Sequence, residues 1–222
     1  MKKLFIAAVL CSTPIWAFAQ DFGKTLISGS ASYSSSKTES NFSDDNQKNH
    51  RFAINPKVGF FVSPNWAMGL SAGYESSTSP SPAIVLVNGN YINLLVDYDS
   101  HSYTAGPFVR YYKAMGNKAA FFGQASANYI YVKSEYEELP VNYISTPSTN
   151  KGGEVNITPG FVFFPSNTIG LEFMMGTIGY SQMKYGTDGS DYSSKSNSFN
   201  ASFGLSSLSL GLSLYLGRTT AE

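Results

Sequence analysis

Hydrophobic and polar residues alternate along most of this chain, in segments separated by turn-forming residues. The stretch from Phe52 to Tyr74 shows this most clearly, with two alternating segments joined by the turn Ser63 to Asn65. Similar pairs of segments run from Thr104 to Tyr129 and from Asn156 to Tyr180. Alternation with a period of two is typical of a β-strand that has one apolar face. Each pair therefore predicts a β-hairpin.

Eight alternating segments can be identified in the whole chain, and the connections between them are alternately long and short. The segments are Thr25 to Ser35, Arg51 to Val62, Trp66 to Ser77, Ser102 to Ala114, Ala119 to Glu135, Gly153 to Phe164, Ile169 to Met183, and Ser198 to Leu216. The short connections are Ser63 to Asn65, Met115 to Lys118 and Pro165 to Thr168; the long ones are Ser36 to His50, Thr78 to His101, Tyr136 to Gly152 and Lys184 to Asn197. An even strand number with short turns at one end and long loops at the other is typical of a membrane barrel. We predict an all-β fold, an eight-stranded antiparallel transmembrane up-and-down β-barrel.

The two faces of each predicted strand differ in polarity. In the second strand Ile54, Val58 and Phe60 share one face, whereas Asn55 and Lys57 share the other. The apolar face continues over about ten residues, enough for a tilted strand to cross a bilayer. In such a barrel the polar side chains point inward. The candidates for lumen-facing residues are Lys57, Glu75, Arg110, Gln124, Asn128, Glu154, Asn156 and Glu172.

These inward residues admit two interpretations. An eight-stranded barrel is narrow enough for side chains to fill its interior, and buried charges must be paired because an unpaired charge costs several kcal/mol. A structural plug is therefore the first interpretation, and a narrow or gated solute path is the second.

Aromatic residues gather near both ends of the predicted strands, as in the interfacial girdles of membrane barrels. The residues near the short turns are Phe60, Phe61, Trp66, Tyr111, Tyr112, Phe121, Phe163 and Phe164, and those near the opposite ends are Tyr33, Tyr74, Tyr103, Tyr129 and Tyr131.

Three irregularities interrupt the alternation. A proline lacks a ladder donor, so we expect a local bulge at each of Pro56, Pro107 and Pro159. Tyr180 falls on the inner face when the phase is counted from Ile169, so either the strand bulges or this side chain points inward. The last strand changes phase, which predicts a one-residue bulge at Ser206 and Ser207.

The first 19 residues have the features of a secretory signal peptide: Lys2 and Lys3, an apolar run, and small residues before Gln20. We therefore divide the chain into a signal peptide, 1–19, and a barrel domain, 20–222. A lipoprotein signal at Cys11 is the alternative, although Leu10 stands where a small residue is expected. Removal of the two lysines leaves 13 basic and 15 acidic residues. This balance gives no reason to expect nucleic acid as a partner.

Three segments, NPKVGFFVSPNWAMGLSAGY, GPFVRYYKAMGNKAAFFGQA and SLSLGLSLYL, resemble the outer membrane β-barrel family common in Bacteroidota, which is often called porin-like, and more distantly the small OmpA/OmpX-like barrels. The resemblance implies a protein of the cell outer membrane with periplasmic termini and four surface loops. The implied partners are outer membrane lipids and, during biogenesis, the barrel assembly machinery. The implied role is non-enzymatic: envelope integrity, surface contact or limited passage of small solutes. The sequence leaves the oligomeric state open.

An enzymatic alternative follows from the likeness of some small barrels to lipid A-modifying enzymes, which place Ser, His and an acid at the outer rim. Here Asp99, His101 and Ser102 lie together near that rim. Adjacent strand residues point to opposite faces, so His101 and Ser102 should not act on one surface. The acidic clusters Asp44–Asp45 and Asp188–Asp191 lack the spacing of a calcium loop. We expect no catalytic site, no metal and no cofactor.

The connection from Thr78 to His101 is unusually apolar and contains the hairpin signal Asn88–Gly89. We predict a hairpin above the barrel or over its mouth. Such a surface could contact another surface protein or a hydrophobic ligand, or pack on neighbouring loops; the hairpin could also add two strands to make a ten-stranded barrel. The candidate contact residues are Ile84, Leu86, Tyr91, Leu94 and Leu95.

Overall fold

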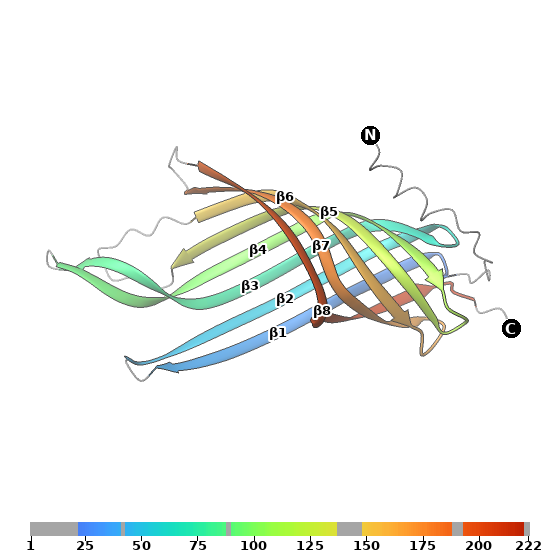
Figure 1. Cartoon of the computed structure of the whole chain (residues 1–222), viewed down its shortest axis with the longest axis horizontal. Coiled ribbons are helices and arrows are strands. Elements are labelled where there is room, and N and C mark those ends of the chain that lie inside the picture. Colours follow the sequence, from blue (N-terminus) through green and yellow to red (C-terminus); the bar gives the residue numbers. More distant parts are fainter. Residues whose placement is uncertain (1–21, 41–42, 88–89, 137–147, 188–192, 220–222) are drawn as a thin grey trace.

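The chain forms one closed antiparallel barrel (Figure 1). The structure, a computed structural model, describes residues 22–40, 43–87, 90–136, 148–187 and 193–219. The strands are β1 (Thr25–Ser40), β2 (Ser43–Ser63), β3 (Trp66–Val87), β4 (Asn90–Ala114), β5 (Ala119–Tyr136), β6 (Ser148–Phe163), β7 (Ile169–Thr187) and β8 (Ser193–Leu216). They follow one another around the ring in chain order, which confirms the eight-stranded up-and-down prediction. The predicted signal peptide and Cys11 lie outside the described residues, and no helix in the described part is long and apolar enough to span a membrane.

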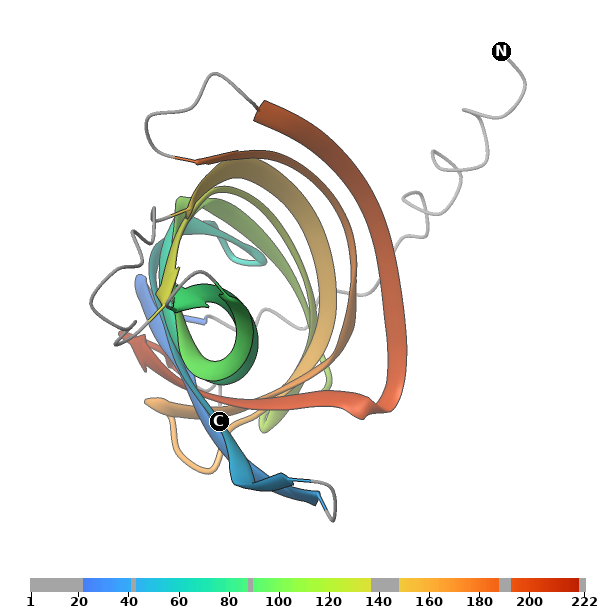
Figure 2. The same ribbon diagram turned by 90° about the vertical axis from the view of Figure 1, so that its left-hand side faces the viewer.

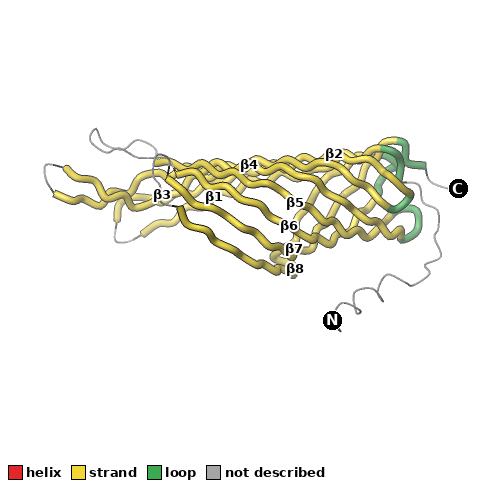
Figure 3. The backbone as a smooth tube through the Cα atoms, turned by 90° about the horizontal axis from the view of Figure 1, so that it is seen from above, coloured by secondary structure: helices red, strands yellow, loops and turns green. Residues whose placement is uncertain are grey.

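The three predicted short turns join β2 to β3, β4 to β5 and β6 to β7, and they lie together at one end of the barrel (Figure 3). Backbone hydrogen bonds from Tyr112 N to Asn65 O and from Phe164 N to Lys118 O, both 2.8 Å long, connect neighbouring turns to the adjacent strands. These bonds connect the turns at this end of the barrel to strands beyond their own hairpins.

The strands are longer than we predicted, because much of the expected long loops is also strand. The segment 36–50 belongs mostly to β1 and β2, and 78–101 mostly to β3 and β4. These polar sequences still pair as strands, although the β1–β2 register shifts between Thr38 and Ser40. Asn88 and Gly89 lie outside the described residues, as do 137–147 and the acidic cluster 188–191.

β3 and β4 pair without interruption from Trp66–Tyr111 to Val87–Asn90. The arms of the apolar hairpin are thus continuous with these two strands, so the ten-stranded alternative is wrong. The described pairs with the neighbouring strands stop earlier, at His50–Thr78 between β2 and β3 and at Tyr98–Tyr136 between β4 and β5. The far part of β3 and β4 forms a two-stranded ribbon that extends beyond the barrel (Figure 1).

A bulge accompanies only one of the three strand prolines. The β2–β3 ladder skips Pro56 and the β4–β5 ladder skips Pro107, but the register is the same on both sides of each gap. Only the β6–β7 register shifts next to Pro159, between Ile157 and Gly160. The prediction of a bulge at every proline was wrong because a missing N–H interrupts the ladder without requiring an extra residue.

The shift beside Pro159 explains the position of Tyr180. Ile157 pairs with Ile178 and Gly160 with Met174, so β7 contains one more residue than β6 across this interval. Gly176 lies in it with φ of +102°. The extra residue reverses the phase of β7, and Tyr180, 46% exposed, points outward. The first of our two alternatives, a bulge in β7, is therefore correct.

The predicted irregularity in β8 is in the right place but is larger than one residue. Met175 pairs with Leu208 and Gly176 with Phe203, so one step along β7 corresponds to five along β8. Both Phe203 and Leu208 are exposed. The phase change therefore keeps the apolar residues on both sides of the irregularity on the outer face, Phe199 and Phe203 before it and Leu208, Leu210 and Leu212 after it.

The barrel closes through a short contact between its first and last strands. The β1–β8 pairs that the structure describes run from Thr25–Leu216 to Gly29–Leu212. Beyond Gly29 the two strands diverge, with β8 bending away while β1 continues alongside β2 (Figures 1 and 2). We call this divergence the β1–β8 seam.

Candidate functional site

The interior of the barrel is packed at the end that carries the short turns. Phe22, which precedes β1, is fully buried there. The centroid of its ring lies 4.8 Å from the ring centroid of Tyr112 and 5.8 Å from that of Phe61. Tyr215 and Phe164 complete this aromatic cluster, with ring centroids 4.9 Å apart. Rings that close together fill the narrow cross-section of an eight-stranded barrel. We call this packed region the base.

The backbone before β1 holds Phe22 in place. Lys24 N donates to Leu216 O over 2.8 Å, and Phe61 N donates to Lys24 O over 3.0 Å. Gly23 has φ of +96°, and a Cβ on it would lie 2.6 Å from Leu216 O. Only glycine fits this conformation and this close approach. The first described residues are thereby clamped between β2 and β8.

Arg110 and Glu172 form a buried ion pair above the aromatic cluster. Arg110 Nη1 donates to Glu172 Oε1 over 2.6 Å, and the side-chain exposures are 0% and 3%. The pair connects β4 to β7, which are not neighbours in the sheet, so it crosses the interior. Buried charges are tolerated only when they are paired and hydrogen-bonded.

Further contacts complete the network around Arg110. Its Nη2 and Nε both donate to Gln124 Oε1, over 2.8 and 3.1 Å, and its Nη1 also donates to Tyr112 Oη over 3.1 Å. The guanidinium carbon lies 4.2 Å from the centre of the Phe122 ring. Tyr112 and Tyr215 share a hydroxyl–hydroxyl hydrogen bond of 3.1 Å. Side chains of four strands, β4, β5, β7 and β8, are thus joined in one polar layer.

Arg218 fastens the base from outside the strands. Its Nη2 donates to Asn117 O over 2.6 Å, in the turn between β4 and β5, and its guanidinium carbon lies 3.8 Å from the centre of the Phe164 ring. Burial lowers the pKa of Arg218, and the nearby Tyr215 hydroxyl acts in the opposite direction. The residue joins the end of β8 to a turn on the other side of the ring.

Three aromatic residues that we expected in the outer girdle belong to the base instead: Phe61, Tyr112 and Phe164. The strand phase carried a signal for this, because two adjacent residues of a strand cannot both face lipid. Each of these three residues directly follows an outward aromatic, namely Phe60, Tyr111 and Phe163. Phe22 and Tyr215 were also missed as interior residues, since neither belongs to the polar pattern that we used to find inward positions.

A polar cavity of about 890 Å³ lies in the interior beyond Gln124. Predicted lumen residues that line it are Lys57, Gln124, Asn128, Glu154 and Asn156; the other lining residues include Ser30, Arg51, Asn55, Ser71, Thr104, Thr158, Met174, Thr177, Ser202 and Ser209. The structure therefore brings five of the eight candidates to one cavity.

The other three candidates also lie on inward-facing positions. Arg110 and Glu172 form the buried ion pair of the base. At the rim, Glu75 Oε2 accepts a hydrogen bond of 2.7 Å from Arg51 Nη2. Within the cavity, Asn128 Nδ2 donates to Glu154 Oε1 over 3.0 Å, and Ser71 Oγ donates to Asn128 Oδ1 over 3.0 Å.

The outer surface is apolar in the region between the two sets of aromatic side chains. The outward aromatics near the short turns are Phe60, Trp66, Tyr111, Phe121 and Phe163, and those at the opposite level include Tyr33, Tyr103 and Tyr129. Tyr74 and Tyr131 adjoin Tyr103, with ring centroids 5.3 and 6.3 Å away. The remaining members of the predicted girdles thus lie on the outside.

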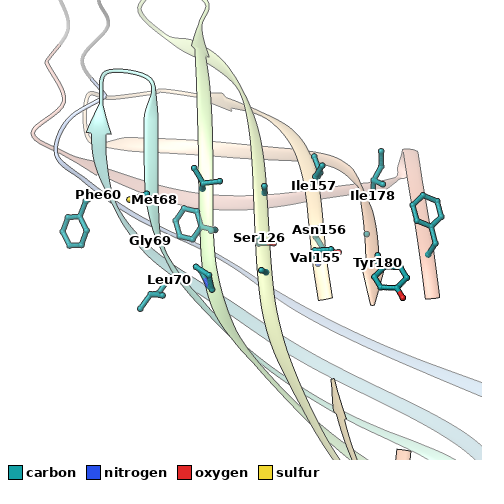
Figure 4. Close-up of a pocket in the computed structure, with 17 residues that line it drawn as sticks. Phe60, Met68, Gly69, Leu70, Ser126, Val155, Asn156, Ile157, Ile178 and Tyr180 are labelled. Carbon is teal, nitrogen blue, oxygen red and sulfur yellow. The ribbon is translucent and has the colours of Figure 1, made fainter. Parts of the chain in front are cut away.

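Between these levels the outer face is hollowed into a groove of about 900 Å³ (Figure 4). Apolar side chains from β2 to β8 line it, among them Phe60, Met68, Leu70, Val109, Val155, Ile157, Ile178 and Phe199. An exposed apolar area of this extent is unusual on a protein surrounded by water.

The rim residues considered for catalysis are engaged elsewhere. His101 Nδ1 lies 3.1 Å from Tyr74 Oη on the outer face. Ser102 occupies the next position on β4 and therefore points inward. Asp99 Oδ1 accepts a 2.6 Å hydrogen bond from Thr78 Oγ1. Ser76 pairs with His101 across the ladder and Asp99 lies on the same face of β4, but the described hydrogen bonds of His101 and Asp99 go to Tyr74 and Thr78 and form no serine–histidine–acid relay.

The predicted surface-contact residues lie on the ribbon formed by β3 and β4. Leu86 pairs with Tyr91, and Leu94 and Leu95 pair with Ala83 and Pro82. The side chains of Ile84, Leu86, Tyr91 and Leu94 are outside the described part of the structure; that of Leu95 is exposed, as is that of Ile92.

Comparison with known proteins gives a remote similarity. No family model matches the chain, and no curated protein matches it. The solved structures that are similar include Neisserial surface protein A (NspA), with 10% identity and a TM-score of 0.36 over 86% of this chain and 96% of that chain. Another is a major outer membrane protein from Thermus thermophilus, with 12% identity and a TM-score of 0.39 over 86% of this chain and 98% of that chain. Likeness at this level assigns no family and no activity, so the resemblance to Bacteroidota barrels stays a prediction.

Proposed function

We propose that this chain is a non-enzymatic outer-membrane β-barrel of the cell envelope, and that its interior is closed to through-passage. The location is supported by the apolar outer band between two aromatic levels and by the groove within it, which lipid tails would fill. It is also supported by the even strand number and the short turns at one end, which face the periplasm in such barrels.

The observation that carries the closed interior is the buried pair Arg110–Glu172 above the Phe22 cluster. Its groups cross the barrel and make hydrogen bonds to side chains of β5 and β8. An ion that passed through would have to separate this pair and displace packed rings, which costs several kcal/mol. The barrel then supports envelope integrity and surface contact rather than solute passage.

Conductance of the purified protein in planar bilayers tests this proposal. The natural protein should be silent, whereas removal of two large base side chains, in the double variant Phe22→Ala and Tyr112→Ala, should produce measurable conductance. The matched control is Phe60→Ala with Tyr111→Ala, which removes equivalent rings from the outer face. Steady conductance of the natural protein that is lost when Arg110 or Glu172 is made bulkier would instead support a solute path.

A second candidate function is contact with another surface protein through the β3–β4 ribbon. The observation in its favour is that, among the described residues, both edges of the ribbon extend beyond the last pairs with β2 and β5, while Ile92 and Leu95 are exposed. Unpaired edges can accept an additional strand from a partner. Deletion of 83–96 should leave the barrel folded and reduce surface adhesion; loss of folding would mean that the ribbon only packs on its own barrel.

A further inference from the structure

The β1–β8 seam opens at the depth of the apolar outer band. The last pair is Gly29–Leu212, and the next outward residues are Ala31 on β1 and Leu210 on β8. Tyr33, at the level of the second aromatic set, follows only two residues later. With the barrel in a membrane, the first part of the seam, 30–33 on β1, faces hydrocarbon.

An empty seam at this depth is energetically unfavourable. Each backbone N–H or C=O without a partner in hydrocarbon costs several kcal/mol. Beyond Gly29, the edge of β1 that faces β8 pairs with none of its described residues. The edges therefore require a group that can satisfy polar atoms on one side and meet lipid on the other.

The polar cavity extends to both edges of the seam. Ser30, the first β1 residue beyond the closing pairs, lines the cavity, and so do Ser202 and Ser209 of β8. The wall of the cavity therefore includes residues on both edges of the seam, where β1 and β8 are no longer paired. A molecule in the cavity could extend through the seam into the membrane.

The cavity contains one cation that the protein does not pair. Arg51 is paired with Glu75, and the carboxylate of Glu154, which lines the same cavity, accepts a hydrogen bond from the uncharged Asn128 amide. Within the described part of the chain, Lys57 Nζ makes no hydrogen bond or ion pair, although it lines the same cavity. The charges of Arg110 and Glu172 below it already balance each other. An anionic group beside Lys57 is the complement that this ammonium group lacks.

We propose that the cavity and the seam together form a binding site for an anionic phospholipid, which rests on the membrane location proposed above. The phosphate lies at Lys57, the hydroxyl-rich wall of Ser30, Ser202 and Ser209 contacts the head group, and the acyl chains pass through the seam into the bilayer. The lipid thereby covers the unpaired edges of β1 and β8. Binding involves no covalent step.

Retention of lipid by the purified barrel tests this site. Protein in nanodiscs that contain equal amounts of phosphatidylglycerol and phosphatidylcholine, with identical acyl chains, is transferred to detergent and its bound lipid counted by native mass spectrometry. The natural protein should retain phosphatidylglycerol preferentially. Lys57→Gln should reduce this retention at least about tenfold, the factor expected for one hydrogen bond to a charged group.

Two variants keep the result interpretable. Lys57→Arg preserves the charge and should retain the lipid, which separates binding from a folding defect. Lys113→Gln changes an exposed lysine at the short-turn end of β4 that does not line the cavity, and it should have no effect. Equal retention by the natural protein and Lys57→Gln overturns the proposal, and so does equal binding of soluble glycerol phosphate alone, which would indicate an anion site with no acyl component.

The position of the acyl chains is tested with a phosphatidylglycerol that carries a photoactivatable diazirine on one acyl chain, close to the head group. Labelling should concentrate on 30–33 and 208–212 in the natural protein and decrease in Lys57→Gln. Uniform labelling of the outer surface overturns the seam as the route. Conductance is read separately in planar bilayers, so a silent barrel without retained lipid refutes this site alone, and a conducting barrel refutes the closed interior.

Discussion

Arg110 Nη1 lies 2.6 Å from Glu172 Oε1, and this buried contact joins β4 to β7 across the barrel. The two residues are 62 positions apart in the sequence and lie on strands that are not neighbours. The pair marks the boundary between two parts of the interior: packed aromatic rings on one side and the polar cavity on the other.

The first prediction concerns this pair. Arg110→Ala should lower the free energy of unfolding by about 3–5 kcal/mol, because it leaves the Glu172 carboxylate buried without a partner. The change is measured by urea unfolding in lipid vesicles. The double variant Arg110→Met with Glu172→Met should recover much of this loss. Arg51→Ala, which breaks the exposed pair with Glu75, should cost no more than about 1 kcal/mol. Similar losses for Arg110→Ala and Arg51→Ala would contradict this account.

The second prediction concerns the residue that closes the base. Phe22→Ala removes a fully buried ring and should cost about 3–5 kcal/mol of unfolding free energy. Phe60→Ala removes an equally large ring that is 60% exposed on the outer face. In detergent, the loss of unfolding free energy in Phe60→Ala should be much smaller, because detergent tails can fill the space that the ring leaves on the outer face. An equal effect of both variants would mean that Phe22 does not pack inside the barrel.

The third prediction concerns the bulge in β7. A Cβ at Gly176 would lie 1.9 Å from Ser202 O, at a φ of +102°. Gly176→Ala should therefore prevent folding or destabilise the barrel strongly, as read from the yield of folded protein by circular dichroism. At Gly123 a Cβ would have no atom within 4 Å. Gly123→Ala should be neutral or stabilise by about 0.5–1 kcal/mol, because alanine loses less entropy in a strand.

The fourth prediction concerns the clasp made by Arg218. Arg218→Ala removes a charged hydrogen bond to Asn117 O and should cost about 1.5–3 kcal/mol. Thermal unfolding in detergent measures the change. Arg218→Lys keeps the charge but loses the planar stacking on Phe164, so it should restore only part of the stability. Full restoration by lysine would show that charge alone is sufficient.

The fifth prediction addresses enzymatic activity. His101 Nδ1 lies 3.1 Å from Tyr74 Oη, and Asp99 Oδ1 accepts a hydrogen bond from Thr78 Oγ1. Ser76 pairs with His101 across the β3–β4 ladder, but these described hydrogen bonds do not join it, His101 and Asp99 into a relay. Cells that express the natural protein or His101→Ala should therefore contain the same lipid A species by mass spectrometry. A modification present only with the natural protein would reopen the enzyme hypothesis.

The sequence predicted the features that depend on local pattern. Alternation gave the number and approximate position of the strands, and proline, glycine and asparagine gave the three short turns. The same phase, applied consistently, would also have placed Tyr112 and Phe61 inside, since each directly follows an outward aromatic residue. These errors, and the same one at Phe164, came from assigning aromatic residues by depth alone. The length of the strands was underestimated because polar, serine-rich segments carry little hydrophobic contrast.

What the sequence determined by itself is the face on which most side chains lie, because a period of two separates inside from outside in every regular strand. The tertiary structure decided which inward side chains meet. A shift of two residues between strands keeps every side chain on its face but changes its depth, so alternation could not predict that Arg110 reaches Glu172 or that Phe22 lies beneath Tyr112. The β1–β8 seam likewise depends on how the last strand bends after the ring has closed, and only the assembled barrel specifies that bend.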